Sequence, residues 1–322
     1  MHAKIMLLPA SAPGEKLCGY AEQILTEVSA AFQHSFTLKR EKIGEKSMAA
    51  YNEPLTDEAV EACLQCQGIF LCDAECEGAQ DLYDALDLPL RIRSFCVPDA
   101  LCGRHESPVS LWMAQAFSVD SDTLRRAMHS AFRFAHEIDT GIVHVPPAGA
   151  SRQEWESAIR VQETDFPQLP VAQFTAPDAM TALISAPNRL GLMLCPPYAG
   201  GMLHAAATAL CSYPSMMHDA AFDGEMGVYA PYIPKNLEMD EELNPFATAL
   251  AVGALLRYSL HLSREAGCVE AAVNNVLSSG YCPLDPHAPV ENQKSAQELV
   301  DLICEQIAVA GELMGKAGMM GH

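Results

Sequence analysis

The stretch that decides the fold is LNPFATALAVGALLRYSL, residues 243–260. Asn244 has a side chain suited to a helix N-cap, and Pro245 suits the first helical position, so the pair predicts where a helix begins. The positions after Pro245 are almost all apolar, and Arg257 is the one charged residue among them. We expect a long apolar helix through Leu260, then helices over about 265–277 and 295–313.

Strand-like and helix-like segments alternate through the rest of the chain. Residues 4–8 (KIMLL), 68–72 (GIFLC) and 191–195 (GLMLC) are short apolar runs typical of buried strands. Further strands are predicted at 36–38, 142–145 and 171–174, and helices at 17–32, 56–63, 121–137, 153–161 and 201–210. Residues 213–244 are expected to be rich in loops. The alternation predicts an α/β fold with a mostly parallel or mixed sheet flanked by helices.

Composition narrows the functional classes. The 322 residues carry 20 Lys and Arg against 41 Asp and Glu, a formal net charge of −21. Such an acidic chain repels phosphate backbones and anionic lipid surfaces, so we expect no nucleic acid and no membrane partner. The first residues are too briefly apolar for a signal peptide. Together with twelve cysteines, read as reduced thiols, this predicts a cytoplasmic protein.

Several segments resemble one enzyme family, in matching order and spacing. Residues 243–260 resemble the ANPIAT…LRYSL helix of the isopropylmalate and isocitrate dehydrogenases. Residues 270–281 resemble their IEAAV…EGY segment, and 295–301 resemble the start of their TSEMGD helix. Near the beginning, residues 4–9 resemble KIAVLPG, 54–63 resemble PLPDETLEAC, and 87–93 lie where DLYANLRP is expected. The sequence thus resembles a divergent member of these β-decarboxylating dehydrogenases.

The resemblance implies a two-domain fold and a dimer. Residues 1–98 with 225–322 would form one discontinuous α/β domain, and residues 99–224 a second one with a shortened clasp region. In that family the active site lies between the domains and takes residues from the neighbouring subunit. We therefore expect a homodimer, or a heteromer with an intact homologue.

The family's metal ligands are replaced in this sequence. Oxidative decarboxylation of a 2-hydroxy acid needs a divalent cation held by hard oxygen ligands. Two of the family's aspartates come from GDILSDE, and here Gly201 and Ala205 stand in their places. Pro177 stands where the third, from YVDN, is expected, although a shift of one residue would restore Asp178. We expect no Mg²⁺ site and assign no metal ligand.

The positions for proton transfer and substrate capture are also changed. Pro147 stands where the VDKANV segment supplies a lysine, and the segment that carries the family's tyrosine is not found, so we assign no catalytic residue. Arg93 matches the arginine of NLRP and is our one predicted substrate-binding residue. Tyr83 replaces an arginine upstream, and Arg104 is the remaining candidate for a third.

The nucleotide side retains little of the family pattern. The GDGIGPE turn becomes residues 10–15, ASAPGE, without the glycines that let a backbone approach a dinucleotide. The HGSAPDIAG loop is replaced by residues 232–237. Asn244 resembles the asparagine that contacts adenine and is our one predicted cofactor-binding residue, with a plain N-cap as its alternative role. NAD is the cofactor that the resemblance implies, and we commit to none.

Three hypotheses follow. The first is a pseudoenzyme, a non-catalytic or chemically altered relative that binds a small molecule or serves as a partner subunit. The second is a divergent NAD(P)-dependent oxidoreductase or decarboxylase of a 2-hydroxy acid, with a site rebuilt around His204, Arg93 and Glu225. The third is metal binding by a cysteine cluster of four candidate ligands in fourteen residues, Cys63, Cys66, Cys72 and Cys76.

Overall fold

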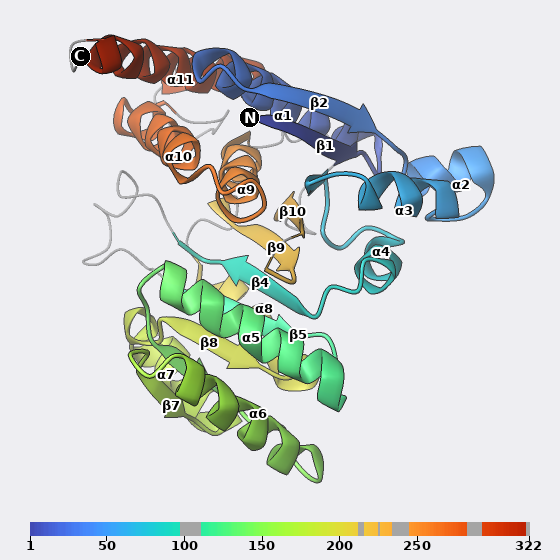
Figure 1. Ribbon diagram of the computed structural model, residues 1–322, viewed down its shortest axis with the longest axis vertical. Coiled ribbons are helices and arrows are strands. Elements are labelled where there is room, and N and C mark those ends of the chain that lie inside the picture. The colour runs from blue at the N-terminus through green and yellow to red at the C-terminus, as the bar shows by residue number, and fades with distance from the viewer. Residues whose placement is uncertain (97–110, 212–215, 225, 234–244, 282–291, 320–322) are drawn as a thin grey trace.

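A ten-stranded mixed sheet forms the centre of the computed structural model, which describes residues 1–96, 111–211, 216–224, 226–233, 245–281 and 292–319 (Figure 1). The strand order is β2-β1-β3-β10-β9-β4-β5-β8-β6-β7. The strands are β1 His2–Leu8, β2 Ser35–Arg40, β3 Gly68–Leu71, β4 Leu90–Ser94, β5 Trp112–Ala116, β6 Ile142–His144, β7 Val171–Gln173, β8 Leu192–Cys195, β9 His218–Phe222 and β10 Gly227–Pro231. The predicted α/β class with a mixed sheet is confirmed.

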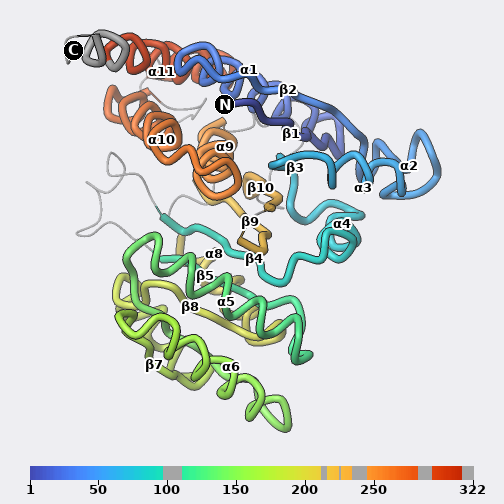
Figure 2. The backbone as a smooth tube through the Cα atoms, viewed as in Figure 1, coloured from blue at the N-terminus to red at the C-terminus, as the bar shows by residue number. Residues whose placement is uncertain are grey.

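Helices flank this sheet along its length. They are α1 Ala12–Ala31, α2 Glu45–Tyr51, α3 Asp57–Leu64, α4 Ala79–Ala85, α5 Ser121–Glu137, α6 Ser151–Asp165, α7 Ala176–Ser185, α8 Pro197–Leu210, α9 Pro245–Tyr258, α10 Ser263–Ser278 and α11 Ala296–Met319, with a 3₁₀ turn at Pro187–Arg189. In the tube view α1 and α11 run side by side at one end of the molecule, and α6 and β7 lie at the other (Figure 2). None of the described helices is long and apolar enough to cross a membrane.

The sheet changes direction at its centre. Strands β2, β1, β3 and β10 are parallel, β9 is antiparallel to both β10 and β4, and β5 is antiparallel to β4. Beyond β5, strands β8, β6 and β7 run parallel to it. Strands β4 and β9 therefore join two parallel groups that point in opposite directions. The division into residues 1–98 with 225–322 and 99–224 stays a prediction.

The helix predicted from residues 243–260 is the most enclosed helix of the core. Eleven of the fourteen residues of α9 are buried, and it packs against α1, α10 and β10. Its Leu255 side chain lies so close to Gly68 at the start of β3 that a Cβ there would come within 3.1 Å of it. An apolar helix can be buried on all sides because its backbone hydrogen bonds are satisfied within the helix.

The expectation of a loop-rich stretch over residues 213–244 is wrong in part. Residues 218–222 and 227–231 form the antiparallel pair β9 and β10. Their sequences, HDAAF and GVYAP, contain alanine, aspartate and proline and only one β-branched residue, so local β propensity is weak. Both strands are held by their neighbours β4 and β3, which a local pattern does not reveal.

Candidate functional site

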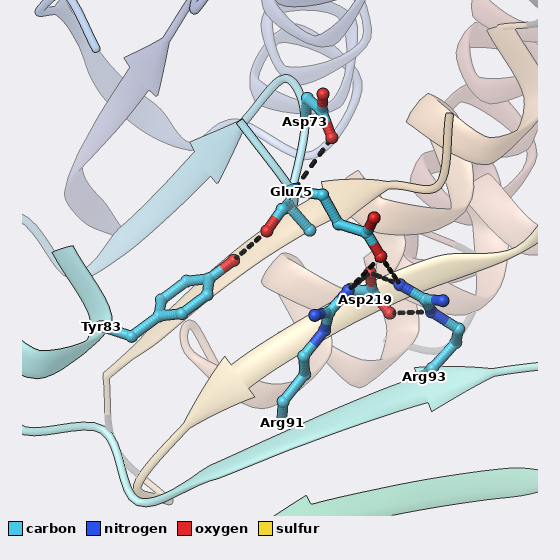
Figure 3. Close-up of polar contacts among 7 residues, drawn as sticks. Asp73, Glu75, Tyr83, Arg91, Arg93 and Asp219 are labelled. Atoms are coloured by element: carbon cyan, nitrogen blue, oxygen red, sulfur yellow. Dashed lines mark hydrogen bonds and ion pairs between the residues drawn. The ribbon is translucent and has the colours of Figure 1, made fainter. Parts of the chain in front are cut away.

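Two arginines of β4 enclose one carboxylate of β9 at the centre of the sheet (Figure 3). Arg93 pairs with Asp219 in the strand register, and Arg91 lies two residues earlier, so both side chains leave the sheet on the same face. Arg93 Nε donates to Asp219 Oδ1 at 2.6 Å and Arg93 Nη2 donates to Oδ2 at 2.7 Å. Arg91 Nη2 also donates to Oδ2, at 2.6 Å. Asp219 thus receives a bidentate contact from Arg93 and a third hydrogen bond from Arg91.

A second carboxylate balances the charge of this cluster. Arg93 Nη2 donates to Glu75 Oε1 at 3.2 Å, and Arg91 Nη2 lies 3.5 Å from the same oxygen. Two guanidinium groups therefore face two carboxylates, Asp219 and Glu75. The link after β3 is shaped by Asp73, whose Oδ1 accepts from the Glu75 backbone N–H at 2.9 Å. We call Arg91, Arg93, Asp219 and Glu75 the arginine cluster.

Electrostatics keeps Asp219 ionised although it is only 2% exposed. Burial alone would raise the pKa of this carboxyl, but the charges of Arg91 and Arg93 outweigh burial and hold the pKa well below its ordinary value. For Asp73 burial has the largest effect and raises the pKa of its carboxyl, because the charge of Arg91 has a smaller influence there. The arginine cluster is thus an internal ion-pair network whose charges depend on one another.

Tyr232 and His204 border the arginine cluster. The Arg93 guanidinium carbon lies 4.5 Å from the centre of the Tyr232 ring, a cation–π contact. His204, on α8, is 6% exposed and lies edge-on to Phe95 with ring centres 6.2 Å apart. Burial, reinforced by the positive charges of Arg93 and Arg91, lowers the pKa of His204 to about 3. The imidazole is therefore neutral, and its Nε2 has no hydrogen-bond partner among the described residues.

The residues at the family's metal positions do not fit a divalent cation. Gly201 and Ala205 on α8 offer no side-chain oxygen. Pro177 and Asp178 lie exposed in the first turn of α7, where Asp178 Oδ2 accepts from Thr175 Oγ1 at 2.6 Å. Over the described part of the chain, no group of three or more His, Cys, Asp or Glu residues could hold a metal ion. This donor set lacks the oxygen ligands that Mg²⁺ requires.

Comparison with known proteins identifies the family. The sequence profile of the isocitrate/isopropylmalate dehydrogenase family matches residues 112–303, more than half of the chain. The chain belongs to this family. Its sequence is 22% identical over 352 aligned residues to the 3-isopropylmalate dehydrogenase of Oceanobacillus iheyensis, covering 95% of this chain and 96% of that protein. A second 3-isopropylmalate dehydrogenase, from Clostridium pasteurianum, is 23% identical and covers 94% of this chain and 99% of that protein.

Solved structures of related dehydrogenases share the fold. The isocitrate dehydrogenase from Methylococcus capsulatus superposes with a TM-score of 0.81 at 15% identity, covering 96% of this chain and 100% of that one. A β-decarboxylating dehydrogenase from Thermococcus kodakarensis gives a TM-score of 0.77 at 15% identity over 95% and 96% of the two chains. The predicted membership of the isocitrate/isopropylmalate dehydrogenase family, and the fold that it implies, are confirmed.

The turn between β1 and α1, where the family's GDGIGPE segment would lie, is filled by the protein's own groups. Ser11 caps α1 by accepting from the Gly14 N–H at 3.1 Å, and Cys72 Sγ accepts from the Ala10 N–H at 3.0 Å. Glu15 places a carboxylate in the first turn, paired with Lys46 and Arg40. Two backbone N–H groups at this helix end are thus already used within the protein, so they are not free to bind a dinucleotide phosphate.

The four cysteines do not form the metal site that their spacing suggested. All four are described, and no group of three or more possible metal ligands includes them. Cys63 is buried within α3, and Cys66 Sγ donates to the Ala62 carbonyl at 3.3 Å. Cys72 Sγ accepts a hydrogen bond from the Ala10 N–H. Burial has the largest effect on each thiol and raises the pKa of all four above the ordinary value. They serve as small apolar side chains of the core.

Sequence reasoning found one member of the arginine cluster, Arg93, and missed the other three. Arg91 lies in the same segment, residues 87–93, for which only Arg93 is a predicted ligand, and Asp219 lies in the stretch expected to be loops. The alternation Arg91-Ile92-Arg93 was the available signal, since it places two cations on one face of a strand. Of the remaining candidates, Asn244, Arg104 and Glu225 lie outside the described residues.

Replacing Asp219 by Ala should destabilise the protein by about 3–5 kcal/mol, because it leaves the buried Arg93 and the partly buried Arg91 without their main partner. The vacated space should then accept a small carboxylate. We expect acetate, compared with chloride at equal ionic strength, to raise the melting temperature of the Asp219→Ala variant but not that of the unaltered protein. Asp122→Asn, which breaks an exposed ion pair with Arg125, is the control and should change stability by less than about 1 kcal/mol. Equal effects of acetate on all three proteins would contradict the assignment.

The neutral state of His204 should make stability depend on pH. Since the pKa of His204 is lowered by folding, the unfolded chain takes up this proton first as the pH falls below about 6.5. The unfolding free energy should then decline by up to about 1.4 kcal/mol per pH unit from this residue, down to about pH 3. In a His204→Leu variant that contribution should be absent from urea titrations at pH 4.5–7.5. The exposed His2→Leu serves as control, and identical pH profiles for both variants would refute the prediction.

Proposed function

We propose that this member of the isocitrate/isopropylmalate dehydrogenase family is a pseudoenzyme for the metal- and NAD-dependent oxidative decarboxylation of 2-hydroxy acids. One observation carries the proposal. The fork of Arg93, the residue that the family pattern assigns to substrate capture, is filled by the carboxylate of Asp219. Its contacts have the parallel, two-point geometry in which an arginine binds a carboxylate ligand. The protein thus supplies internally the group that a substrate would have to bring.

Displacement of Asp219 by a substrate would be energetically costly. A carboxylate ligand would leave Asp219 buried and without its main partner, and breaking a buried ion pair in this way costs about 3 kcal/mol or more. That cost weakens binding by a factor of about one hundred. The arginine cluster also carries no net positive charge to attract an anion. These energies support a role that does not require capture of a dicarboxylate.

The same face favours uncharged ligands. Neutral His204 and the Tyr232 ring lie beside the arginine cluster. A role in binding a small molecule would therefore use hydrogen bonding and ring contacts rather than ion pairing. The ten described cysteines are free thiols, which supports our placing the protein in the reducing cytoplasm.

Purified protein given NAD or NADP, Mg²⁺ or Mn²⁺, and a panel of 2-hydroxy acids should reduce no cofactor, because the residues at the family's metal and proton-transfer positions lack the necessary groups. Absorbance at the wavelength of the reduced nicotinamide measures this directly. The 3-isopropylmalate dehydrogenase of Oceanobacillus iheyensis provides the positive control. Metal-dependent turnover above the background of a heat-denatured sample would overturn the proposal and favour a divergent oxidoreductase with a rebuilt site.

We also propose that α8 forms a subunit interface, in a homodimer or in a heteromer with an intact homologue. Its exposed face carries Tyr198, Met202 and Leu210, which are 84%, 55% and 51% exposed in the single chain. Between them lie alanines, and no residue of α8 has a formal charge. Ile184 of the neighbouring α7 is also exposed and apolar. Exposed apolar side chains on neighbouring helices are typical of interfaces between subunits.

Light scattering on a sizing column should give the unaltered protein a mass about twice its 34.8 kDa. Met202→Lys should lower the mass to that of one chain, because a charge would be buried in an apolar interface. Leu64→Lys, at an apolar residue of α3 with similar exposure, is the control and should leave the mass unchanged. An unaltered protein that runs as a single chain would exclude the homodimer, and mixing with an intact homologue would then test the heteromer.

A further inference from the structure

A cavity of about 650 Å³ opens on the face of the sheet opposite the arginine cluster. Ser94, Trp112 and His218 line it, and these residues are direct partners across β4, β5 and β9. Successive side chains of a strand point to opposite faces of the sheet. Ser94 follows Arg93 and His218 precedes Asp219, so both lie on the face opposite the arginine cluster. Cys96 and residues of helices α5, α9 and α10 supply the remaining walls. The cavity is therefore separate from the arginine cluster, and its volume suits a small organic ligand.

The inner wall of this cavity is aromatic. The Trp112 and His218 rings meet edge to face with centres 6.4 Å apart, and Trp112 packs against Phe134 at 5.1 Å. Phe134 in turn lies 5.2 Å from Tyr258, which also lines the cavity. Trp112 and Tyr258 each keep part of their surface exposed. The cavity thus presents ring faces and edges to whatever enters it.

Charge at the cavity is unbalanced toward the negative. Arg257 Nη2 donates to both oxygens of Glu270, at 2.7 and 2.8 Å, so these two side chains neutralise each other. Glu137, at the end of α5, also lines the cavity and has no hydrogen bond or ion pair within the described residues. The pKa of Tyr258 is raised, mainly by burial and in part by the negative charge of Glu137. The charge of Glu137 therefore acts on the aromatic wall. One carboxylate is left over beside the rings.

We propose that this cavity binds a small organic cation, an amine carried on an apolar or aromatic body. Aromatic rings attract cations through their faces, contributing about 0.5–2 kcal/mol, and Glu137 supplies a counter-charge. Leu250, Ala254 and Ile138 provide apolar contacts for the ligand body. An anion of the same shape would meet an unpaired carboxylate in a protein whose net charge is −21.

Titration calorimetry on the full chain with phenethylamine and with 3-phenylpropionate tests this inference. The two probes have similar bodies and opposite charges. Phenethylamine should bind saturably at one site per chain, and 3-phenylpropionate should not. Binding of both probes with equal affinity, or saturable binding of neither, would overturn the proposal.

Two substitutions locate the binding. Glu137→Gln should weaken phenethylamine about two- to fivefold, because it removes the unpaired carboxylate at an exposed position. Glu154→Gln, on the exposed first turn of α6, changes the net charge equally and should leave the affinity unchanged, so it separates a local effect from general attraction to an acidic protein. Trp112→Leu should weaken binding about tenfold by removing the ring. Equal affinities for Glu137→Gln and Glu154→Gln would refute the cavity as the site.

Discussion

The ion pairing between β4 and β9 is the constraint on which the centre of this protein depends. The two parallel groups of strands run in opposite directions, and the pairing of β9 with β4 joins them. Asp219 lies within that pairing and is buried, so it requires compensating charge from the neighbouring strand. Arg91 and Arg93 supply two positive charges, and the carboxylate of Glu75 offsets the second of them. Removing Asp219 from this network would leave Arg93 buried without its bidentate partner.

This network also determines what the face can bind. An arginine attracts a carboxylate ligand when its fork is open and its charge is uncompensated. Here the fork of Arg93 is closed by Asp219, one side of its guanidinium faces Tyr232, and the adjacent His204 is held neutral. On this face the positive charges of Arg91 and Arg93 are matched by the carboxylates of Asp219 and Glu75. Retention of one matching residue is therefore poor evidence for retained chemistry.

The sequence predicted elements where local pattern and tertiary environment agree. The helix over 121–137 was predicted at its observed limits, and Pro245 marked the observed start of α9. The strands β4, β5, β9 and β10 and the helices α2, α4 and α7 were not predicted. Most of these are short, and β9 in particular is ordered by neighbours on both sides rather than by its own residues. The partner of Arg93 could not be predicted because Asp219 is 126 positions away, and no rule of spacing connects them.

Family folds persist through such changes because packing and chemistry depend on different features of the sequence. A core needs apolar volume in a suitable pattern, and many sequences satisfy that need, which explains a TM-score of 0.81 at 15% identity. Chemistry needs particular atoms at a few positions. The alternation of side chains along a strand also lets the two faces of the sheet differ independently. Asp219 and His218 are neighbours in sequence, yet their side chains lie on opposite faces. The arginine cluster and the aromatic cavity therefore depend on different side chains of the same strands, and a change at one need not alter the other.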